Sequence, residues 1–187
     1  QDVLGNAVYK WTGGWRNSFT YKGFNLGFLI DFKFGAKIFS GTNYQLYYYG
    51  MHKNTLNGRT PENPAGSIVA QGIDEVTGQP NTTAVTSQDY YRAICNANIA
   101  EEFVYSADFI KLRELSFGYT FPKKFLEPLK YVKGLSVSFV ARNLWTIMKH
   151  TPNIDPESAI NNTNAQGLEL NGYPATRNIG FNINVKF

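Results

Sequence analysis

Five stretches of the chain alternate apolar and polar residues with a period of two, which is typical of β-strands whose two faces meet different surroundings. In the last of these stretches the two kinds of residue separate completely by parity. Its apolar positions are Ile179, Phe181, Ile183, Val185 and Phe187, and its polar positions include Asn182, Asn184 and Lys186. The pattern predicts strands at about 13–21, 24–38, 103–121, 134–147 and 176–187.

The same alternation gives each of the earlier strands an apolar and a polar face. The apolar positions include Phe24, Leu26, Phe28, Ile30 and Phe32 in the second strand, Phe117 and Tyr119 in the third, and Phe139 in the fourth. The opposite faces carry Asp31, Lys33 and Arg142. Arg113 has the parity of the apolar Leu115, so we expect it to lie above the apolar zone or beyond a β-bulge that changes the phase.

The connections between the predicted strands alternate between short and long. A tight turn at 22–23 and a proline-containing turn at 122–133 are short, whereas 39–102 and 148–175 are long, and 1–12 precedes the first strand. Loops of more than about 12–15 residues are uncommon in compact domains and are usually functional. Within the longer one, SQDYYRAICNANIA predicts a short helix in 87–100, with Ser87 as a plausible N-cap.

Two architectures fit strands of this kind: an antiparallel sandwich with one face in a core, and a membrane barrel with one face in lipid. The long Phe-rich faces, strands long enough for a tilted bilayer crossing of about 9–11 residues, and the short and long loops on opposite sides favour the barrel. Five strands cannot close a membrane barrel, which needs about eight. We therefore predict an all-β segment of a larger barrel wall, with the apolar face in lipid and the polar face toward the lumen.

Composition narrows the class of protein further. Aromatic residues make up 16% of the 187 residues and charged residues 17%, against a usual charged share of about 25%. The net charge of +4 comes from scattered residues, so the sequence lacks the basic stripe of a nucleic-acid-binding protein. Cys95 is the only cysteine, which excludes an internal disulfide or a thiolate zinc site.

The sequence contains no convincing catalytic motif, and we predict neither an enzyme nor a cofactor or metal requirement. His52 and His150 lie in different loops without the carboxylate pattern of a zinc site. Asp155 and Glu157 in NIDPES fit either a calcium ligand pair or turn chemistry, of which the turn is the commoner.

A cluster of tyrosines follows the second predicted strand and is the candidate binding surface of the long loop. Broad faces and hydroxyls suit tyrosine to stacking on sugars or gripping a protein partner. The alternative is a structural role, in the interfacial aromatic belt or in packing within the loop. The cluster consists of Tyr44, Tyr47, Tyr48 and Tyr49.

Several ordered segments of the chain resemble the carboxy-terminal part of the SusC/RagA family of TonB-linked outer-membrane transporters of Bacteroidota. The matching segments are KWTGGWRNSFTYKGFNLGFLIDFKFGAKIFSGT, YSADFIKLRELSFGYTFPKKF, LSVSFVARNLWTIMKHTPNIDPE and GYPATRNIGFNINVKF. From the first to the last they span nearly the whole chain, in the family's order. The loop at 52–86 has no counterpart that we can match, so it carries no inference about substrate.

The resemblance implies a plugged barrel of about 22 strands, capped by a SusD-like surface lipoprotein and driven by TonB through amino-terminal parts that this sequence lacks. It also implies outer-membrane localisation, with 1–12, 39–102 and 148–175 extracellular and both short turns and the carboxy terminus periplasmic. Its other partners would be the rest of the barrel and plug, membrane lipid, and a glycan or peptide cargo, with no nucleic acid. The remaining alternatives are an adhesive or structural outer-membrane barrel and a soluble β-sandwich binding module.

Overall fold

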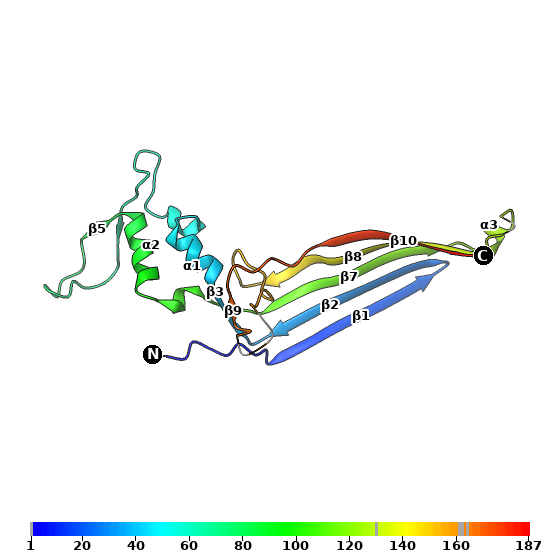
Figure 1. Cartoon of the computed structure of the whole chain (residues 1–187), viewed down its shortest axis with the longest axis horizontal. Helices are drawn as coiled ribbons and strands as arrows, with labels where there is room; N and C mark the ends of the chain where they lie inside the picture. The colour runs from blue at the N-terminus through cyan, green and yellow to red at the C-terminus, as the bar shows by residue number, and fades with distance from the viewer. Residues whose placement is uncertain (1, 130, 161–162, 164) are drawn as a thin grey trace.

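The computed structural model describes residues 2–129, 131–160, 163 and 165–187, and its main feature is one long antiparallel sheet (Figure 1). Five strands form it in the spatial order β1-β2-β7-β8-β10, with every neighbouring pair antiparallel. Their bounds are β1 Trp11–Tyr21, β2 Phe24–Phe34, β7 Phe109–Thr120, β8 Gly134–Lys149 and β10 Asn178–Lys186. The outer strands β1 and β10 each have a single partner, so the sheet is open rather than closed.

Both short connections lie at the same end of this sheet. A turn at Lys22-Gly23, in which both residues have positive φ, joins β1 to β2, the geometry that matches the twist of a hairpin. The connection from β7 to β8 contains the short helix α3, Lys123–Leu126. The carboxy terminus lies at this end as well (Figure 1).

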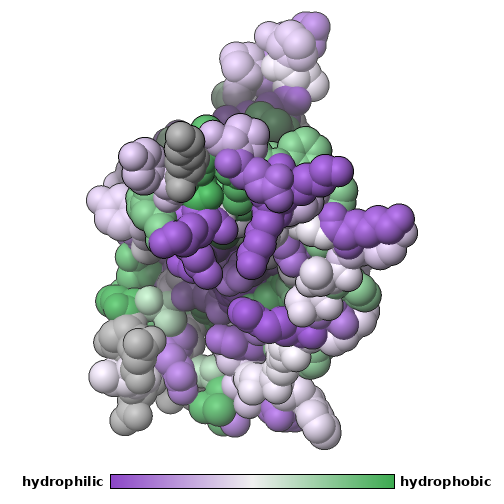
Figure 2. Space-filling model, turned by 90° about the vertical axis from the view of Figure 1, so that its right-hand side faces the viewer, coloured by the Kyte–Doolittle hydropathy of each residue, from purple (hydrophilic) through white to green (hydrophobic). Residues whose placement is uncertain are grey.

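Exposed lysines gather at this end of the molecule. The view along the sheet in Figure 2 shows hydrophilic side chains massed there. The exposed lysines of the turns and strand ends are Lys22, Lys123, Lys124, Lys133 and Lys186. Glu127 is the acidic residue of the α3 connection, so the fold brings together at this end lysines that are scattered along the sequence.

The opposite end carries a small sheet and a helical unit (Figure 1). The small sheet has the order β6-β3-β9, formed by β3 Lys37–Ser40, β6 Val104–Ser106 and β9 Leu168–Glu169. Beyond it the chain forms α1 Gly41–Tyr48, η1 Lys53–Leu56, α2 Ser87–Asn96 and η2 Ala100–Phe103, with the short pair β4 Ile68–Val69 and β5 Ala84–Val85. None of the helices in the described part of the chain is long and apolar enough to span a bilayer.

The structure divides two of the predicted strands. The predicted 24–38 becomes β2 and β3, and the predicted 103–121 becomes β6 and β7. Both breaks occur at the same level, where the Asp108 carboxylate accepts the Gly35 N–H and the Ala107 N–H bonds to the Ala36 carbonyl. The backbone is satisfied across the break by these bonds, so β3 and β6 can leave the large sheet and pair with each other.

The long segment 39–102 is an ordered unit rather than an irregular loop. The predicted helix is present as α2, although its N-cap is Thr86, whose hydroxyl accepts the Asp89 N–H, and not Ser87. Helix α1 was not predicted. The helical unit has a hydrophobic core that contains Tyr47, Tyr91, Cys95 and Phe103, each at most 6% exposed. This part of the chain therefore buries a hydrophobic cluster of its own.

Candidate functional site

The strand register gives the large sheet one continuous apolar face. Paired positions such as Phe28 and Leu115, or Phe139 and Phe181, keep the same side across neighbouring strands. Rings meet across strands on this face: Phe24 and Phe117 have centroids 6.1 Å apart, and Phe139 and Phe181 5.7 Å apart. The paired residues that we predicted to face lipid all lie on this side: Phe24, Leu26, Phe28, Ile30, Phe32, Phe117, Tyr119, Phe139, Ile179, Phe181, Ile183 and Val185.

This face is left uncovered by the described chain. Phe181 is 77% exposed and Ile183 64%, and Phe187 follows the last residue of β10 with 78% exposure. An exposed apolar surface of this extent marks a membrane or protein contact. Its contact with lipid remains a prediction.

The opposite face of the sheet is polar. Residues at its paired positions include Asn25 and Gly118, Gly27 and Ser116, and Ser138 and Asn182. The residues predicted to face the lumen lie on this side: Asp31, Lys33, Arg142, Asn182, Asn184 and Lys186. Their orientation toward a barrel lumen stays a prediction, as does the lipid contact of the other face.

Six charged side chains form an ion-pair network on the polar face, near the end that carries the helical unit. Lys111, which is 3% exposed, donates to Asp155 at 2.7 Å and to Glu157 at 2.8 Å. Arg113 donates to Asp31 at 2.6 Å and to Glu157 at 2.7 Å, and Lys33 lies 3.2 Å from Glu157. The network therefore binds the segment 155–157 to strands β2 and β7.

A β-bulge places Arg113 in this network. The pairing of β7 with β8 shifts between Leu112 and Glu114, so that Arg113 has no opposite residue. Its side chain therefore lies on the polar face, although Arg113 has the same parity as Leu115 in the sequence. This confirms the prediction that a β-bulge changes the phase at Arg113. Its Nη1 also donates to Asn143 at 3.0 Å, which ties the network to β8.

The network explains the Asp-Pro-Glu sequence without a metal ion. Asp155 also accepts the Glu157 N–H at 2.9 Å, which is turn chemistry, and Pro156 accepts from the Tyr9 hydroxyl at 3.3 Å. The side chains of Lys33, Lys111 and Arg113 bind the carboxylate oxygens that would otherwise coordinate calcium. Burial raises the pKa of Glu157, but the hydrogen bonds from Lys111 and Arg113 outweigh it and lower this pKa to about 2.

We expect Glu157→Gln to loosen the segment 150–160 while leaving the large sheet intact. The substitution removes the negative charge that three cations share, at a cost of about 1–3 kcal/mol for such charged hydrogen bonds. Hydrogen exchange should become faster in 150–160 and stay unchanged in β2 and β7. Glu114→Gln is the matched control, because its single pair is long, 3.8 Å, and its partner Arg16 is exposed, and such pairs contribute little. Equal exchange in the two variants would refute the anchoring role.

The anchor should also respond to acid. Since the pKa of Glu157 in the folded chain is about 2, below its ordinary value of 4.5, its stabilisation is complete above about pH 4.5 and is lost as the pH falls through 2. At pH 3 the protection factors of the wild-type segment, which are corrected for the slower intrinsic exchange in acid, should thus be lower than at pH 7, while those of Glu157→Gln should change less. A wild-type profile that is flat between these values would contradict the assignment.

The four tyrosines of the candidate binding surface have different positions. Tyr47 is 2% exposed, accepts from Asn54 at 2.7 Å and donates to Glu102 at 3.0 Å, and burial raises its pKa. Tyr44 packs against Phe103 with centroids 5.4 Å apart. Tyr48 lies under the Arg92 guanidinium, 5.1 Å from its ring centroid, and Tyr49 is 64% exposed. Packing therefore accounts for Tyr44 and Tyr47, whereas Tyr48 and Tyr49 have surface available for a ligand.

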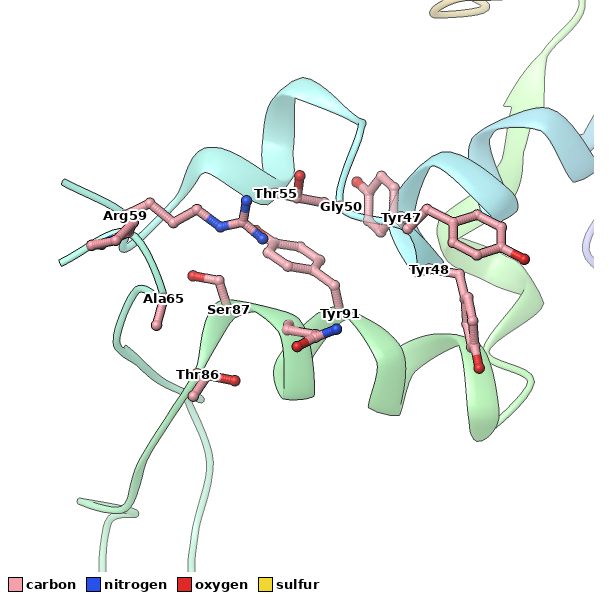
Figure 3. A pocket seen from close by; sticks show the side chains of 12 residues that line it. Tyr47, Tyr48, Gly50, Thr55, Arg59, Ala65, Thr86, Ser87 and Tyr91 are labelled. Carbon is pink, nitrogen blue, oxygen red and sulfur yellow. The ribbon is translucent and has the colours of Figure 1, made fainter. Parts of the chain in front are cut away.

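Tyr47, Tyr48 and Tyr49 also line a cavity of about 290 Å³ inside the helical unit. Its other walls come from the turns after α1 and η1 and from the start of α2 (Figure 3). Arg59 is the only charged residue among the described residues that line it. No sequence motif pointed to Arg59, which stands alone in the turn-forming stretch NGRTPENP.

The histidines do not form a site with other ligating residues. His52 is buried against Tyr47, with ring centroids 4.7 Å apart, and burial lowers its pKa. His150 lies just beyond the end of β8. Within the described ranges, no group of three or more His, Cys, Asp or Glu side chains is placed to hold a metal ion.

Comparison with known proteins shows what the chain is similar to. No protein-family model matches the sequence. The chain is 28% identical to the TonB-dependent receptor P39 of Formosa agariphila over 187 residues and 26% identical to the TonB-dependent receptor P3 of the same organism over 191 residues. Each alignment covers 99% of the chain, which spans only 17% of the length of these curated relatives.

Solved structures share the fold. The RagAB peptide importer in its "closed-closed" state matches with a TM-score of 0.65 at 19% identity, covering 99% of this chain and 18% of the solved one. The "open-open" state matches with a TM-score of 0.62 at 20% identity, covering 94% and 17%. The open five-stranded sheet thus has the fold of one part of the RagAB importer, and the chain resembles a segment of a TonB-dependent transporter of the SusC/RagA type.

Proposed function

We propose that the chain forms part of the outer-membrane wall of a TonB-dependent nutrient importer. The observation that carries this proposal is the continuous apolar face over five strands, opposed to a face of small polar and charged residues. A transmembrane barrel needs this division, because lipid meets one side of its wall and the lumen the other. The identity to two TonB-dependent receptors over nearly the whole chain supports the same function.

The orientation that we propose follows from the distribution of the loops. The turns at 22–23 and 122–133 and the carboxy terminus would be periplasmic, and the segments 1–12, 39–102 and 148–175 extracellular. Outer-membrane barrels have short periplasmic turns and longer extracellular loops. The helical unit and the small sheet lie at the long-loop end (Figure 1), where they would meet incoming cargo.

Cargo and partner are the finer part of the proposal. The cargo would be a glycan or peptide oligomer, and the lid a SusD-like lipoprotein resting on the extracellular loops. The RagAB structures describe a peptide importer, which supports an oligomeric nutrient as the class of cargo. The chain would contribute the barrel wall and the loop surface to import, and no catalytic step.

Uptake by intact cells tests the transport role. Cells that carry the full-length protein should accumulate a labelled cargo oligomer, and deletion of its gene or of TonB should each abolish the uptake. Unchanged uptake in the TonB-deficient cells would argue against energy-coupled import and favour an adhesive barrel. A purified protein that stays monodisperse without detergent would instead exclude the membrane wall and favour a soluble module.

A further inference from the structure

The cavity in the helical unit combines aromatic walls with a single unpaired cation. The Arg59 side chain enters it from one wall, and Tyr91 rises from α2 toward the guanidinium (Figure 3). Gly50 brings the backbone close to the guanidinium, since a Cβ at this position would lie 3.1 Å from Nη2. The guanidinium of the partly exposed Arg59 therefore lies against the cavity wall at Gly50.

Arg59 has no hydrogen-bonding or ion-pair partner for its side chain in the part of the chain that the structure describes. Its Nε is buried and unsatisfied, although buried polar atoms are nearly always hydrogen-bonded. Among the residues that the structure describes, no acidic residue lines the cavity, and their ion pairs involve other cations. A guanidinium in this state lacks the anion that it would bind most strongly.

The polar groups around Arg59 are already engaged and fix the walls of the cavity. The Tyr91 hydroxyl donates to the Asn54 carbonyl at 2.5 Å, and the Ser87 hydroxyl donates to the Asn57 carbonyl at 2.8 Å. Thr55, which is fully buried, donates to the His52 carbonyl at 2.6 Å. The cavity is thus formed in advance, and Arg59 is the group that it leaves available to a ligand.

We propose that this cavity binds a carboxylate group of a ligand, with Arg59 as its ionic partner and the rings of Tyr48 and Tyr49 against the unit that carries the carboxylate. The planar guanidinium fits a carboxylate with two parallel hydrogen bonds. Tyrosine provides broad faces at low entropic cost. The carboxylate has two sources compatible with this cavity, a uronic-acid unit of a glycan and the terminus of a peptide.

Ligand-detected NMR titration of the full-length protein in detergent tests the proposal with two matched pairs of probes. The first pair is methyl glucuronide and methyl glucoside, and the second is alanyl-phenylalanine and its amide. At least one acid should bind, and its neutral counterpart should bind about 10- to 100-fold more weakly, as expected for a hydrogen bond to a charged group. The pair that shows the difference identifies the source of the carboxylate.

Variants then assign the binding to Arg59. Arg59→Gln should weaken binding of the acid by the same factor without affecting the neutral probe, and Arg59→Lys should retain part of the affinity. Lys53→Gln is the matched control, since Lys53 is an exposed cation of the same unit that does not line the cavity. If Arg59→Gln fails to fold, the comparison of acid and neutral probes on the wild type still tests whether a carboxylate group is required for binding.

Two outcomes would overturn the proposal: equal binding of acid and neutral probes, or an unchanged affinity of the acid for Arg59→Gln. The inference rests on the proposed function only for the supply of the ligand, since the titration needs neither TonB nor transport. TonB-dependent uptake without acid binding would refute the carboxylate site alone. Acid binding through Arg59 without uptake would refute the importer and leave the site in place.

Discussion

Phe181→Arg is expected to reduce assembly of the barrel strongly. Phe181 lies in the middle of β10 on the apolar face, paired with Phe139 of β8. If this face meets lipid, an arginine near the bilayer midplane costs about 2–4 kcal/mol. Loss of the contact between the two rings, which meet at an interplanar angle of 65°, adds to this cost.

The neighbouring residue provides the control for this experiment. Asn182 follows directly in the same strand and pairs with Ser138 on the polar face. Asn182→Arg should therefore assemble nearly as well as the wild type in an outer-membrane folding assay read out by heat-modifiable gel mobility. Equal yields for the two variants would show that the apolar face does not meet lipid.

Phe103→Ala is expected to have the second large effect, confined to the helical unit. Phe103 is 1% exposed and meets Tyr47 at a centroid distance of 5.1 Å, Tyr44 at 5.4 Å and Phe39 at 6.5 Å. Truncation of a buried phenylalanine costs about 3–5 kcal/mol. Since these contacts link α1, β3 and η2, residues between 41 and 103 should lose protection together.

Limited proteolysis of the full-length protein, followed by mass spectrometry, measures this effect. New cleavage sites should appear between 41 and 103, whereas β1, β2, β7, β8 and β10 should remain protected. Tyr49→Ala removes an aromatic ring of the same unit that is 64% exposed, and it should leave the cleavage pattern unchanged. Cleavage of the large sheet in Phe103→Ala would show that the helical unit is not an independent cluster.

The two faces of the large sheet could be read from the sequence because strand parity is a local property. The alternation of adjacent residues is enough to assign Ile179 to the apolar face and Asn182 to the polar face. The register of β8 with β10 keeps the same two faces across both strands. The bulge at Arg113 was one of two predicted possibilities, because strict alternation would have placed this charged side chain on the apolar face. The shift between Ile110 and Lys111, which leaves Ile147 of β8 without an opposite residue, left no comparable trace in the sequence.

The end of the molecule that carries the helical unit was less predictable, because distant contacts determine it. Helix α1 has the sequence GTNYQLYY, with little helix propensity, and it depends on the Ser40 cap and on packing against Phe103. Asp155 and Glu157 suggested a turn or a cation site. Their partners Lys111 and Arg113 lie more than forty residues earlier in the chain, so no local pattern connects them. The position of Arg59 in a cavity likewise could not be predicted, because the other lining residues come from distant segments such as α1 and α2.

The ion-pair network restricts movement of the segment 155–157 at this end of the sheet. Three cations and three carboxylates from β2, β7 and the segment 155–157 balance one another, so that displacement of the segment must break several charged contacts at once. The segment 155–157 is therefore fixed to the sheet at this end. In the importer that we propose, an opening motion would have to occur beyond this segment, in the helical unit or in neighbouring strands.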